Sequence, residues 1–202
     1  MLVRNRMSRK VITTRADRPL DEIRTTLQRR RIRQLPVMAA SRVTGMVTDR
    51  DLRSATPRAK VVGDIMSRKA VVIAPTASVD EAARILRMRK INALPVVEHN
   101  RLVGIITASD VLEAFVDLSG VAEPSYRLTL FAKRNGKGLP DVRRIVERQR
   151  AELKWAHVER RTQRAPIHVR LKTRRIDDVT TALEGAGFDV TAVVSARDAT
   201  PR

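Results

Sequence analysis

The sequence predicts an α+β protein that contains two copies of a β-α-β-β-α unit, packed as a pseudo-symmetric pair, and a third domain with the order βαββαβ. Three observations support this prediction: an internal repeat in the first 120 residues, helical periodicity alternating with short β-rich runs inside each copy, and a change of pattern after Pro124. The predicted divisions are residues 1–60 and 61–120 for the two repeats, 125–197 for the third domain and 198–202 for a tail.

The repeat has a period of 59 residues and needs no gap. Shifting the chain by this period superposes Met7-Ser8-Arg9-Lys10 on Met66-Ser67-Arg68-Lys69, Asp21-Glu22 on Asp80-Glu81, Leu35-Pro36-Val37 on Leu94-Pro95-Val96, Gly45 on Gly104, Thr48 on Thr107 and Asp51 on Asp110. A unit of about 55 residues exposes one apolar sheet face and is marginally stable alone. We therefore expect the two copies to pack against each other.

The second copy shows each element of the repeated unit. An extended run is expected at 70–73, and a helix over 79–90, where apolar residues recur at helical spacing and basic residues fill the last turn. Two β-rich runs between residues 94 and 106 predict a hairpin. A second helix begins after Thr107, and its apolar side is expected to comprise Val111, Leu112, Phe115 and Val116.

The last third of the chain alternates between strand and helix patterns. The predicted elements are a strand at 126–131, a helix from Pro140, strands at 153–159 and 167–171, a helix over 176–183 and a strand at 189–194. A basic glycine loop at 133–138 and a basic connector at 160–164 join them. This order of elements is that of a ferredoxin-like domain.

Basic residues outnumber acidic ones, with 41 Lys and Arg against 22 Asp and Glu and a formal net charge of +19. The excess lies in residues 1–60 and 125–202, whereas 61–124 is nearly neutral. Anionic partners are therefore expected, although arginine also collects on solvated faces that bind nothing. The chain has no cysteine, which excludes disulfides and thiolate chemistry. No long apolar run or secretory signal pattern is present, so we expect a cytoplasmic protein without membrane contact.

The repeated motifs resemble those of the CBS domain. Each copy carries Met-Ser, an extended segment, an amphipathic helix, Ile-x-x-Leu-Pro-Val, and then Gly, two aliphatic residues and Thr-x-x-Asp. These motifs are Ile32–Val37 with Gly45–Asp51 in the first copy, and Ile91–Val96 with Gly104–Asp110 in the second. The resemblance implies two ligand sites for an adenine nucleotide (AMP, ADP or ATP) or for S-adenosylmethionine.

By the same resemblance, each Asp would contact ribose, each Thr would lie by the phosphates, and the residues before the first strand and around Leu-Pro-Val would form the adenine pocket. The first site would then use Ile12, Thr13, Arg33, Gln34, Leu35, Pro36, Thr48 and Asp51, with Arg50 as an added cation beside the phosphates. The second, more neutral site would use Val71, Val72, Asn92, Ala93, Leu94, Pro95, Thr107 and Asp110. We expect the first site to favour ligands with more phosphates.

The Thr-x-x-Asp element also has a purely structural interpretation. It is a helix capping box, in which the Thr side chain accepts a backbone N–H and the Asp side chain accepts another. The ligand interpretation uses the same helix N-terminus, whose free N–H donors and positive dipole end suit a phosphate. The sequence leaves both interpretations open.

The third domain, placed after two CBS units, resembles an ACT domain, and the order of the three domains resembles the acetoin-utilisation type of CBS protein. The resemblance implies a homodimer in which the ACT-like domain transmits ligand binding to an unidentified regulated protein. ACT domains usually carry an acidic residue in the first β-to-α loop, whereas this chain has Lys133, Arg134 and Asn135 there. An amino-acid ligand is therefore disfavoured, and the domain either takes an anionic ligand or serves only in dimerisation.

Two other classes of function are alternatives: nucleic-acid binding and catalysis. A nucleic-acid-binding protein is suggested by the sequence pI of about 11.6 and by the arginines of helix 21–33, with the repeats as a scaffold. Aromatic residues make up only 2% of the chain, which argues against a stacking platform for single strands. An enzyme is not expected, because His99, His157 and His168 lie far apart in the sequence and no catalytic triad, Walker loop or metal-ligand spacing is present.

Overall fold

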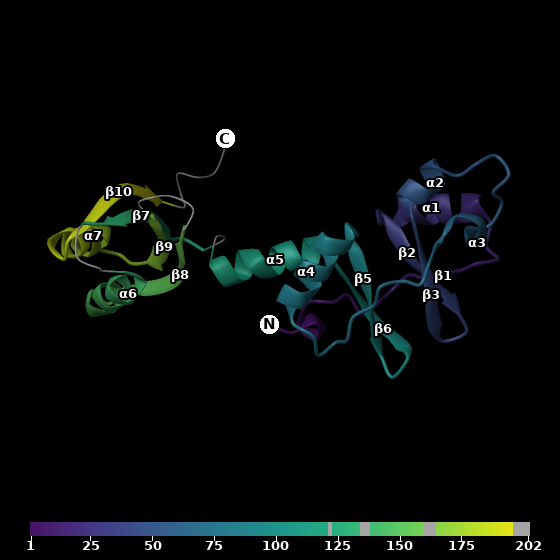
Figure 1. The fold of residues 1–202 in the computed structure, drawn as a ribbon, viewed down its shortest axis with the longest axis horizontal. Helices are drawn as coiled ribbons and strands as arrows, with labels where there is room; N and C mark the ends of the chain where they lie inside the picture. The colour runs from purple at the N-terminus through teal and green to yellow at the C-terminus, as the bar shows by residue number, and fades with distance from the viewer. Residues whose placement is uncertain (121–122, 134–137, 160–164, 196–202) are drawn as a thin grey trace. The chain divides into compact units, whose positions relative to one another are not determined.

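The computed structural model describes residues 1–120, 123–133, 138–159 and 165–195. The chain forms two compact units, Met1–Ala114 and Phe115–Arg202 (Figure 1). The tail predicted at 198–202 and the connector predicted at 160–164 lie outside the described residues, as do residues 134–137 of the basic glycine loop.

The first repeat contains a short strand, a helix, a hairpin and a second helix. Its elements are η1 (Val3–Asn5), β1 (Thr14–Arg15), α1 (Leu20–Arg30), β2 (Gln34–Ala39), β3 (Arg42–Thr48) and α2 (Asp49–Arg53). Helix α1 carries acidic residues in its first turn and arginines in its last, which complements the helix dipole, and it buries Leu20, Ile23 and Leu27. It ends at Arg31, whose left-handed backbone (φ 52°) closes the helix where glycine is commonest.

The second repeat follows the same order, except at its start. Its elements are α3 (Val62–Ile65), β4 (Ser67–Arg68), α4 (Val79–Arg89), β5 (Ala93–Glu98), β6 (Arg101–Thr107) and α5 (Ala108–Ser119). The strand predicted at 70–73 is absent: Ile73 alone forms a parallel bridge with Val96. The segment meets the sheet only at this residue because the chain turns away at Pro75.

Helix α5 exposes part of the side predicted to be apolar and buried. Val111 and Ala114 pack on the core of the second repeat, whereas Leu112 and Phe115 are 62% and 55% exposed. Leu112 points about 100° away from Val111 around the helix, and Phe115 lies beyond the end of the first unit. The predicted burial of Leu112 and Phe115 was therefore wrong.

The two repeats exchange their leading segments. Val3 and Met7 lie in the core of the second repeat, and Val62 lies in the core of the first, with Met66 packed against it. The exchange also involves main-chain hydrogen bonds, because Ser8 bridges β6 while β4 pairs with β3. Each repeat therefore completes its core and sheet with residues from the segment that precedes the other, and packing crosses the linear division between residues 60 and 61.

Gly45 and Gly104 permit this exchange. A Cβ at Gly45 would overlap the carbonyl oxygen of Ser67, and one at Gly104 would lie 2.5 Å from the sulfur of Met7 and 3.1 Å from the carbonyl oxygen of Ser8. In each repeat the close neighbour of this glycine is therefore the leading segment exchanged between the repeats.

The second unit has the predicted order βαββαβ, formed by β7 (Tyr126–Ala132), α6 (Leu139–Arg148), β8 (Glu152–Val158), β9 (Ile167–Lys172), α7 (Ile176–Gly185) and β10 (Phe188–Ser195). The strand order is β10-β7-β9-β8, and all neighbours are antiparallel. Both helices pack on one face of this sheet, through a core that includes Leu128, Val142, Val146, Val169 and Leu183 (Figure 1).

Two features are absent from residues 1–120, 123–133, 138–159 and 165–195: a membrane-spanning helix and a metal-binding cluster. No helix among these residues combines the length and apolar character needed to cross a bilayer. The same residues contain no group of three or more His, Asp or Glu side chains arranged to hold a metal ion.

Candidate functional site

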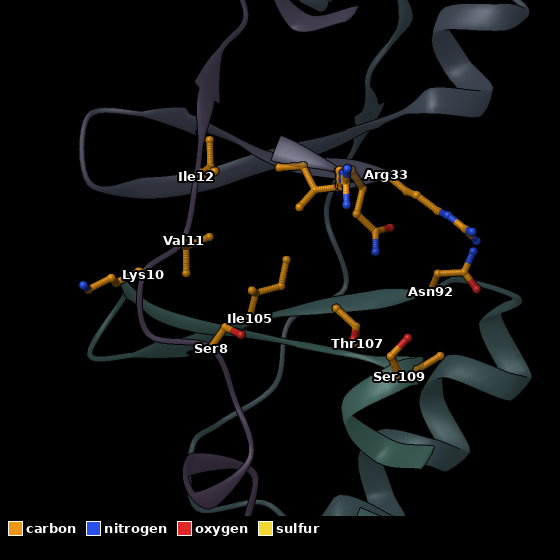
Figure 2. A pocket seen from close by; sticks show the side chains of 13 residues that line it. Ser8, Lys10, Val11, Ile12, Arg33, Asn92, Ile105, Thr107 and Ser109 are labelled. Atoms are coloured by element: carbon orange, nitrogen blue, oxygen red, sulfur yellow. The ribbon is translucent and has the colours of Figure 1, made fainter. Parts of the chain in front are cut away.

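A cavity of about 520 Å³ lies between the two repeats (Figure 2). Its lining comprises Ser8, Lys10, Val11, Ile12, Arg31, Ile32, Arg33 and Gln34 from the first repeat and Asn92, Ile105, Thr107, Ala108 and Ser109 from the second. This volume is within the range of pockets that hold small ligands. Both repeats contribute, so a molecule bound here would contact both of them.

The cavity has an apolar part and a polar end. Figure 2 shows Val11, Ile12 and Ile105 around its middle, and Thr107 and Ser109 together at one end. The side chains of Arg33 and Asn92 lie near that polar end, and Lys10 lies on the opposite side. The arrangement suits an amphipathic ligand with a flat apolar part and a charged part.

The polar end is the N-terminus of α5, which is closed by a capping box. The backbone N–H and the hydroxyl of Thr107 both donate to Oδ2 of Asp110, at 2.6 and 2.8 Å, and the Asp110 N–H donates back to the Thr107 hydroxyl at 3.3 Å. Thr48 and Asp51 make the same three bonds in the first repeat. The capping interpretation of Thr-x-x-Asp is therefore confirmed in both copies.

Capping leaves groups at this helix end that can still bind a ligand. The Ala108 N–H donates to the carbonyl oxygen of Asn92, which ties the start of the helix to the residue before β5. The N–H of Ser109 belongs to the first turn, whose donors have no partner within the helix. Both bonds from Thr107 go to Oδ2 of Asp110, so Oδ1 accepts no hydrogen bond from the described residues. The cap thus fixes the carboxylate with one oxygen available.

The charge of the lining is positive. Lys10, Arg31 and Arg33 are the charged residues that line the cavity, and no carboxylate lines it. None of the three cations forms an ion pair within residues 1–120, 123–133, 138–159 and 165–195. Unpaired cations around a concave site favour an anionic ligand.

The structure brings together five of the residues predicted for a ligand site. These are Ile12, Arg33, Gln34, Asn92 and Thr107, and all of them line the cavity. The other predicted residues do not line it: Thr13, Leu35, Pro36, Thr48, Arg50, Asp51, Val71, Val72, Ala93, Leu94, Pro95 and Asp110.

Several of these other residues have structural roles that account for their place in the motif. Leu35 and Leu94 are 1% and 0% exposed, and their side chains fill the cores of the two repeats. The backbone carbonyl oxygens of Arg33 and Asn92 accept the N–H groups of Asp49 and Ala108. Much of the Leu-Pro-Val motif therefore supports the fold.

The cavity combines the two sites that the sequence suggested. One site was assigned to the motifs of each repeat, yet the cavity joins Ile12, Arg33 and Gln34 of the first repeat to Asn92 and Thr107 of the second. The helix start of one repeat faces the leading segment of the other because those segments are exchanged. Arg33 of the first repeat and Ser109 of the second line the same cavity, whereas Arg50 does not line it.

Sequence reasoning missed seven residues of the cavity: Ser8, Val11, Arg31, Ile32, Ile105, Ala108 and Ser109. For Arg31 a signal was available, because the 59-residue shift places it on Lys90, another cation. Both residues cap their helices in the left-handed conformation, with φ 52° and 54°. A repeated cation at a position that ordinarily favours glycine points to a role other than helix ending.

Comparison with known proteins identifies the repeated unit. A sequence profile of the CBS domain matches residues 3–58 and again residues 62–117, more than half of the chain. The chain belongs to the CBS-domain family. A CBS domain-containing protein of Dictyostelium discoideum is 32% identical over 133 residues, which cover 57% of this chain and 92% of that protein.

Other relatives match this CBS protein over only a part of their own length. The inosine-5'-monophosphate dehydrogenase of Thermoplasma acidophilum is 35% identical over 118 residues, covering 57% of this chain and 24% of the enzyme. The chain thus spans about a quarter of that dehydrogenase, and the likeness concerns the CBS repeats that are generally non-catalytic.

Solved structures of CBS pairs show the same fold, and some of them contain ligands. CBSX2 of Arabidopsis thaliana in complex with AMP is 26% identical, with a TM-score of 0.54 over 57% of this chain and 96% of the other. The CBS domain pair of protein MJ0100, in complex with 5'-methylthioadenosine and S-adenosyl-L-methionine, is 27% identical, with a TM-score of 0.54 over 57% and 99%. A Vibrio cholerae protein assigned to acetoin utilization (AcuB) is 29% identical, with a TM-score of 0.55 over 61% and 96%.

Proposed function

We propose that this CBS protein binds a phosphate-bearing adenosine ligand in the cavity between its repeats and acts as a regulatory sensor of that ligand. The observation that carries the proposal is a cavity with apolar walls, the N-terminus of α5 and three unpaired cations. The bound adenosine compounds in CBSX2 and MJ0100 support the choice of ligand class.

The proposed pose follows from the two parts of the cavity. Adenine lies among Val11, Ile12 and Ile105, where aliphatic side chains contact its faces. The phosphates lie at the polar end, where the Ser109 N–H and the dipole of α5 attract negative charge and Arg33 offers paired N–H donors. Asp110 does not line the cavity, and its part in the proposed pose is to hold the Thr107 hydroxyl at the polar end.

The charge of the lining sets the order of preference. Three cations without a neighbouring carboxylate favour ATP and ADP over AMP. S-adenosylmethionine carries a positive sulfonium and is the least favoured of these ligands.

Regulation follows from the contacts that the ligand makes with both repeats. A ligand shifts a conformational equilibrium only by its difference in affinity for the two states. A nucleotide that bridges the Lys10–Ile12 segment and the start of α5 binds best when the repeats close around it. We propose that a ferredoxin-like, ACT-like C-terminal unit transmits this change within a cytoplasmic homodimer to a regulated protein.

A thermal-shift series with ATP, ADP, AMP, S-adenosylmethionine and 5'-methylthioadenosine tests the proposal. A ligand that binds only the folded state raises the melting temperature by an amount set by its concentration and Kd, about 2.7 kcal/mol of stabilisation at one hundred times Kd. We expect the largest rise with ATP and the smallest with S-adenosylmethionine. The absence of any rise at millimolar concentrations of all five compounds would exclude the proposed function.

A further inference from the structure

Helices α6 and α7 cover one face of the C-terminal sheet, and on the opposite face the chain at Gly120 and Ser125 lies against Lys154 and Arg170. On β7 and β9 the side chains of Leu128, Leu130, Val169 and Leu171 are fully buried toward α6 and α7. Side chains alternate along a strand, so the residues between them point to the opposite face. This open face carries Arg127, Thr129, His168 and Arg170 from the two central strands, and Trp155 and His157 from β8.

Two arginines lie side by side at the centre of the open face. Arg127 and Arg170 are cross-strand partners in the β7–β9 ladder. Partial burial, and next the charge of Arg127, lower the pKa of Arg170, which donates to the hydroxyl of Ser125 at 3.1 Å. Like charges placed directly opposite each other destabilise a sheet, so this pair needs an anionic partner.

The carboxylates near the open face are held by other cations. Glu123 and Glu152 pair with Lys154 at 3.0 and 2.8 Å, and Glu159 pairs with His168 at 3.4 Å. Among the described residues, no carboxylate lies within ion-pair distance of Arg127 or Arg170. Asp189 lies on the edge strand β10, opposite Phe131. Arg127 is exposed and Arg170 is partly buried, and neither has a carboxylate partner among the described residues.

An aromatic stack adjoins the arginines. The rings of Trp155 and His157 are 5.8 Å apart between centroids and inclined by 21°. Trp155 is the cross-strand partner of Arg170, and His157 is that of His168. The sequence argued against a stacking platform because aromatic residues are scarce, and it treated His157 and His168 as far apart. Strand pairing gathers the one tryptophan of the chain and two of its three histidines on one face of the sheet.

We infer that this open face binds single-stranded nucleic acid, with a base stacked on Trp155 and a backbone phosphate held by Arg127 and Arg170. Trp155 is partly exposed, and an aromatic ring on a sheet face offers unpaired bases a stacking surface while arginines contact the backbone. A second copy of the chain fits this face poorly, because a face-to-face dimer would set two arginine pairs against each other. A base pair within a duplex keeps its flat faces stacked on its neighbours and cannot use Trp155.

Trp155 is the chain's one tryptophan, so intrinsic fluorescence reports this site directly. Titration with a short oligouridine, which carries no adenine for the cavity between the repeats, is expected to quench Trp155 saturably. A blunt duplex of mixed sequence is expected not to do so. Absence of quenching by the oligouridine, or equal quenching by the duplex, would overturn the inference.

Matched charge variants separate the site from general basicity. Arg127→Gln with Arg170→Gln is compared with Arg143→Gln and Arg148→Gln, two exposed arginines of α6 on the covered side of the sheet. Both double variants remove the same charge, and circular dichroism melting checks that each folds. Labelled oligouridine is expected to lose affinity, and the slope of log K against log salt to fall by roughly 0.7, as for one lost phosphate contact, only in the first variant. An equal loss in both would show that net charge alone binds the strand.

The aromatic part of the inference is tested with Trp155→Ala and Trp155→Phe. Anisotropy of the labelled oligouridine is expected to show a loss of about 5- to 150-fold for the alanine variant, corresponding to one stacked base, and partial recovery with phenylalanine. Unchanged affinity in a folded alanine variant would contradict stacking on Trp155.

Discussion

The two CBS repeats share one fold but differ in the charge of the residues that meet between them. Both contain the same capping box, the same left-handed helix ending and a glycine that admits the partner repeat's leading segment. The shift that aligns them places Arg33 on Asn92 and Arg50 on Ser109. The duplication thus preserved what the fold requires, while the chemistry at the interface diverged.

This difference in charge makes the two sides of the interface unequal, because each side combines residues from both repeats. The observed cavity joins Lys10, Arg31 and Arg33 to the start of α5, where Ala108 and Ser109 are uncharged. The symmetric positions join Lys69, Lys90 and Asn92 to the start of α2, where Asp49 and Arg50 are charged and Asp49 pairs with Arg53. The comparison suggests that the cavity beside α5 is the better anion site.

The largest loss of stability is expected from substitutions that disturb the exchange of leading segments. Gly45→Ala sets a methyl group against the backbone carbonyl of Ser67, which cannot move without its strand, whereas Gly104→Ala meets the flexible side chain of Met7. We expect both changes to destabilise the protein by about 1–3 kcal/mol, and Gly45→Ala more than Gly104→Ala. Urea unfolding followed by circular dichroism measures the difference.

Gly185→Ala serves as the control for this prediction. It adds the same methyl group where no atom lies within 4 Å. A loss of stability as large as that of Gly45→Ala would contradict the role assigned to close approach.

A smaller effect is expected when the capping threonines are replaced, and it distinguishes their role in stability from a role in ligand binding. Thr48→Val and Thr107→Val each remove one cap and are expected to cost about 1 kcal/mol of stability. Only Thr107→Val is expected to weaken ATP binding, by about three- to tenfold, because the Thr107 hydroxyl holds Asp110 beside the cavity. Calorimetric titration gives the affinities; equal weakening by both variants would rule out this division of roles.

The smallest effect concerns the dependence of stability on pH. The backbone N–H groups of Lys60 and Val61 donate to Asp64 at 2.8 and 3.1 Å, and they lower its pKa below the ordinary value. The repeat shift places Asn5 at this position in the first copy. A lowered pKa in the folded state stabilises the protein above the ordinary pKa, and the stabilisation is lost as pH falls through the lowered value.

Asp64→Asn should therefore reduce the melting temperature near neutral pH and leave it nearly unchanged at a pH below the lowered pKa. Asp80→Asn is the control, since Asp80 is exposed and accepts none of these bonds. The assignment fails if the Asp64 and Asp80 variants show the same pH profile.

The sequence predicted the elements that depend on local pattern. Helix α4, the hairpin of β5 and β6, and the order of the C-terminal unit follow from periodicity and turn residues. The Thr-x-x-Asp boxes were also predictable, because a cap depends on residues three apart. The pattern at 70–73 failed because an extended run becomes a strand only if a neighbouring strand pairs along its length.

The sequence did not predict which parts of the repeats would meet. Residues 10–12 face the start of α5 because the leading segments are exchanged, a tertiary feature with no local signal. Likewise Arg127 and Arg170 are 43 residues apart in the chain, and only the strand register makes them neighbours. In both regions the sequence contains the residues, but it does not show that they lie close together in the fold.

The account's central claim, that the cavity between the repeats binds an adenosine ligand through its phosphates, is tested most directly by calorimetric titration of ATP into matched arginine variants. Arg31→Gln with Arg33→Gln removes two cations that line the cavity, and Arg29→Gln with Arg30→Gln removes two from the last turn of α1 that do not. We predict saturable binding to the unmodified chain, at least about a tenfold loss in the first variant, and little change in the second. Undetectable ATP binding at millimolar concentration, or equal losses in the two variants, would contradict the claim.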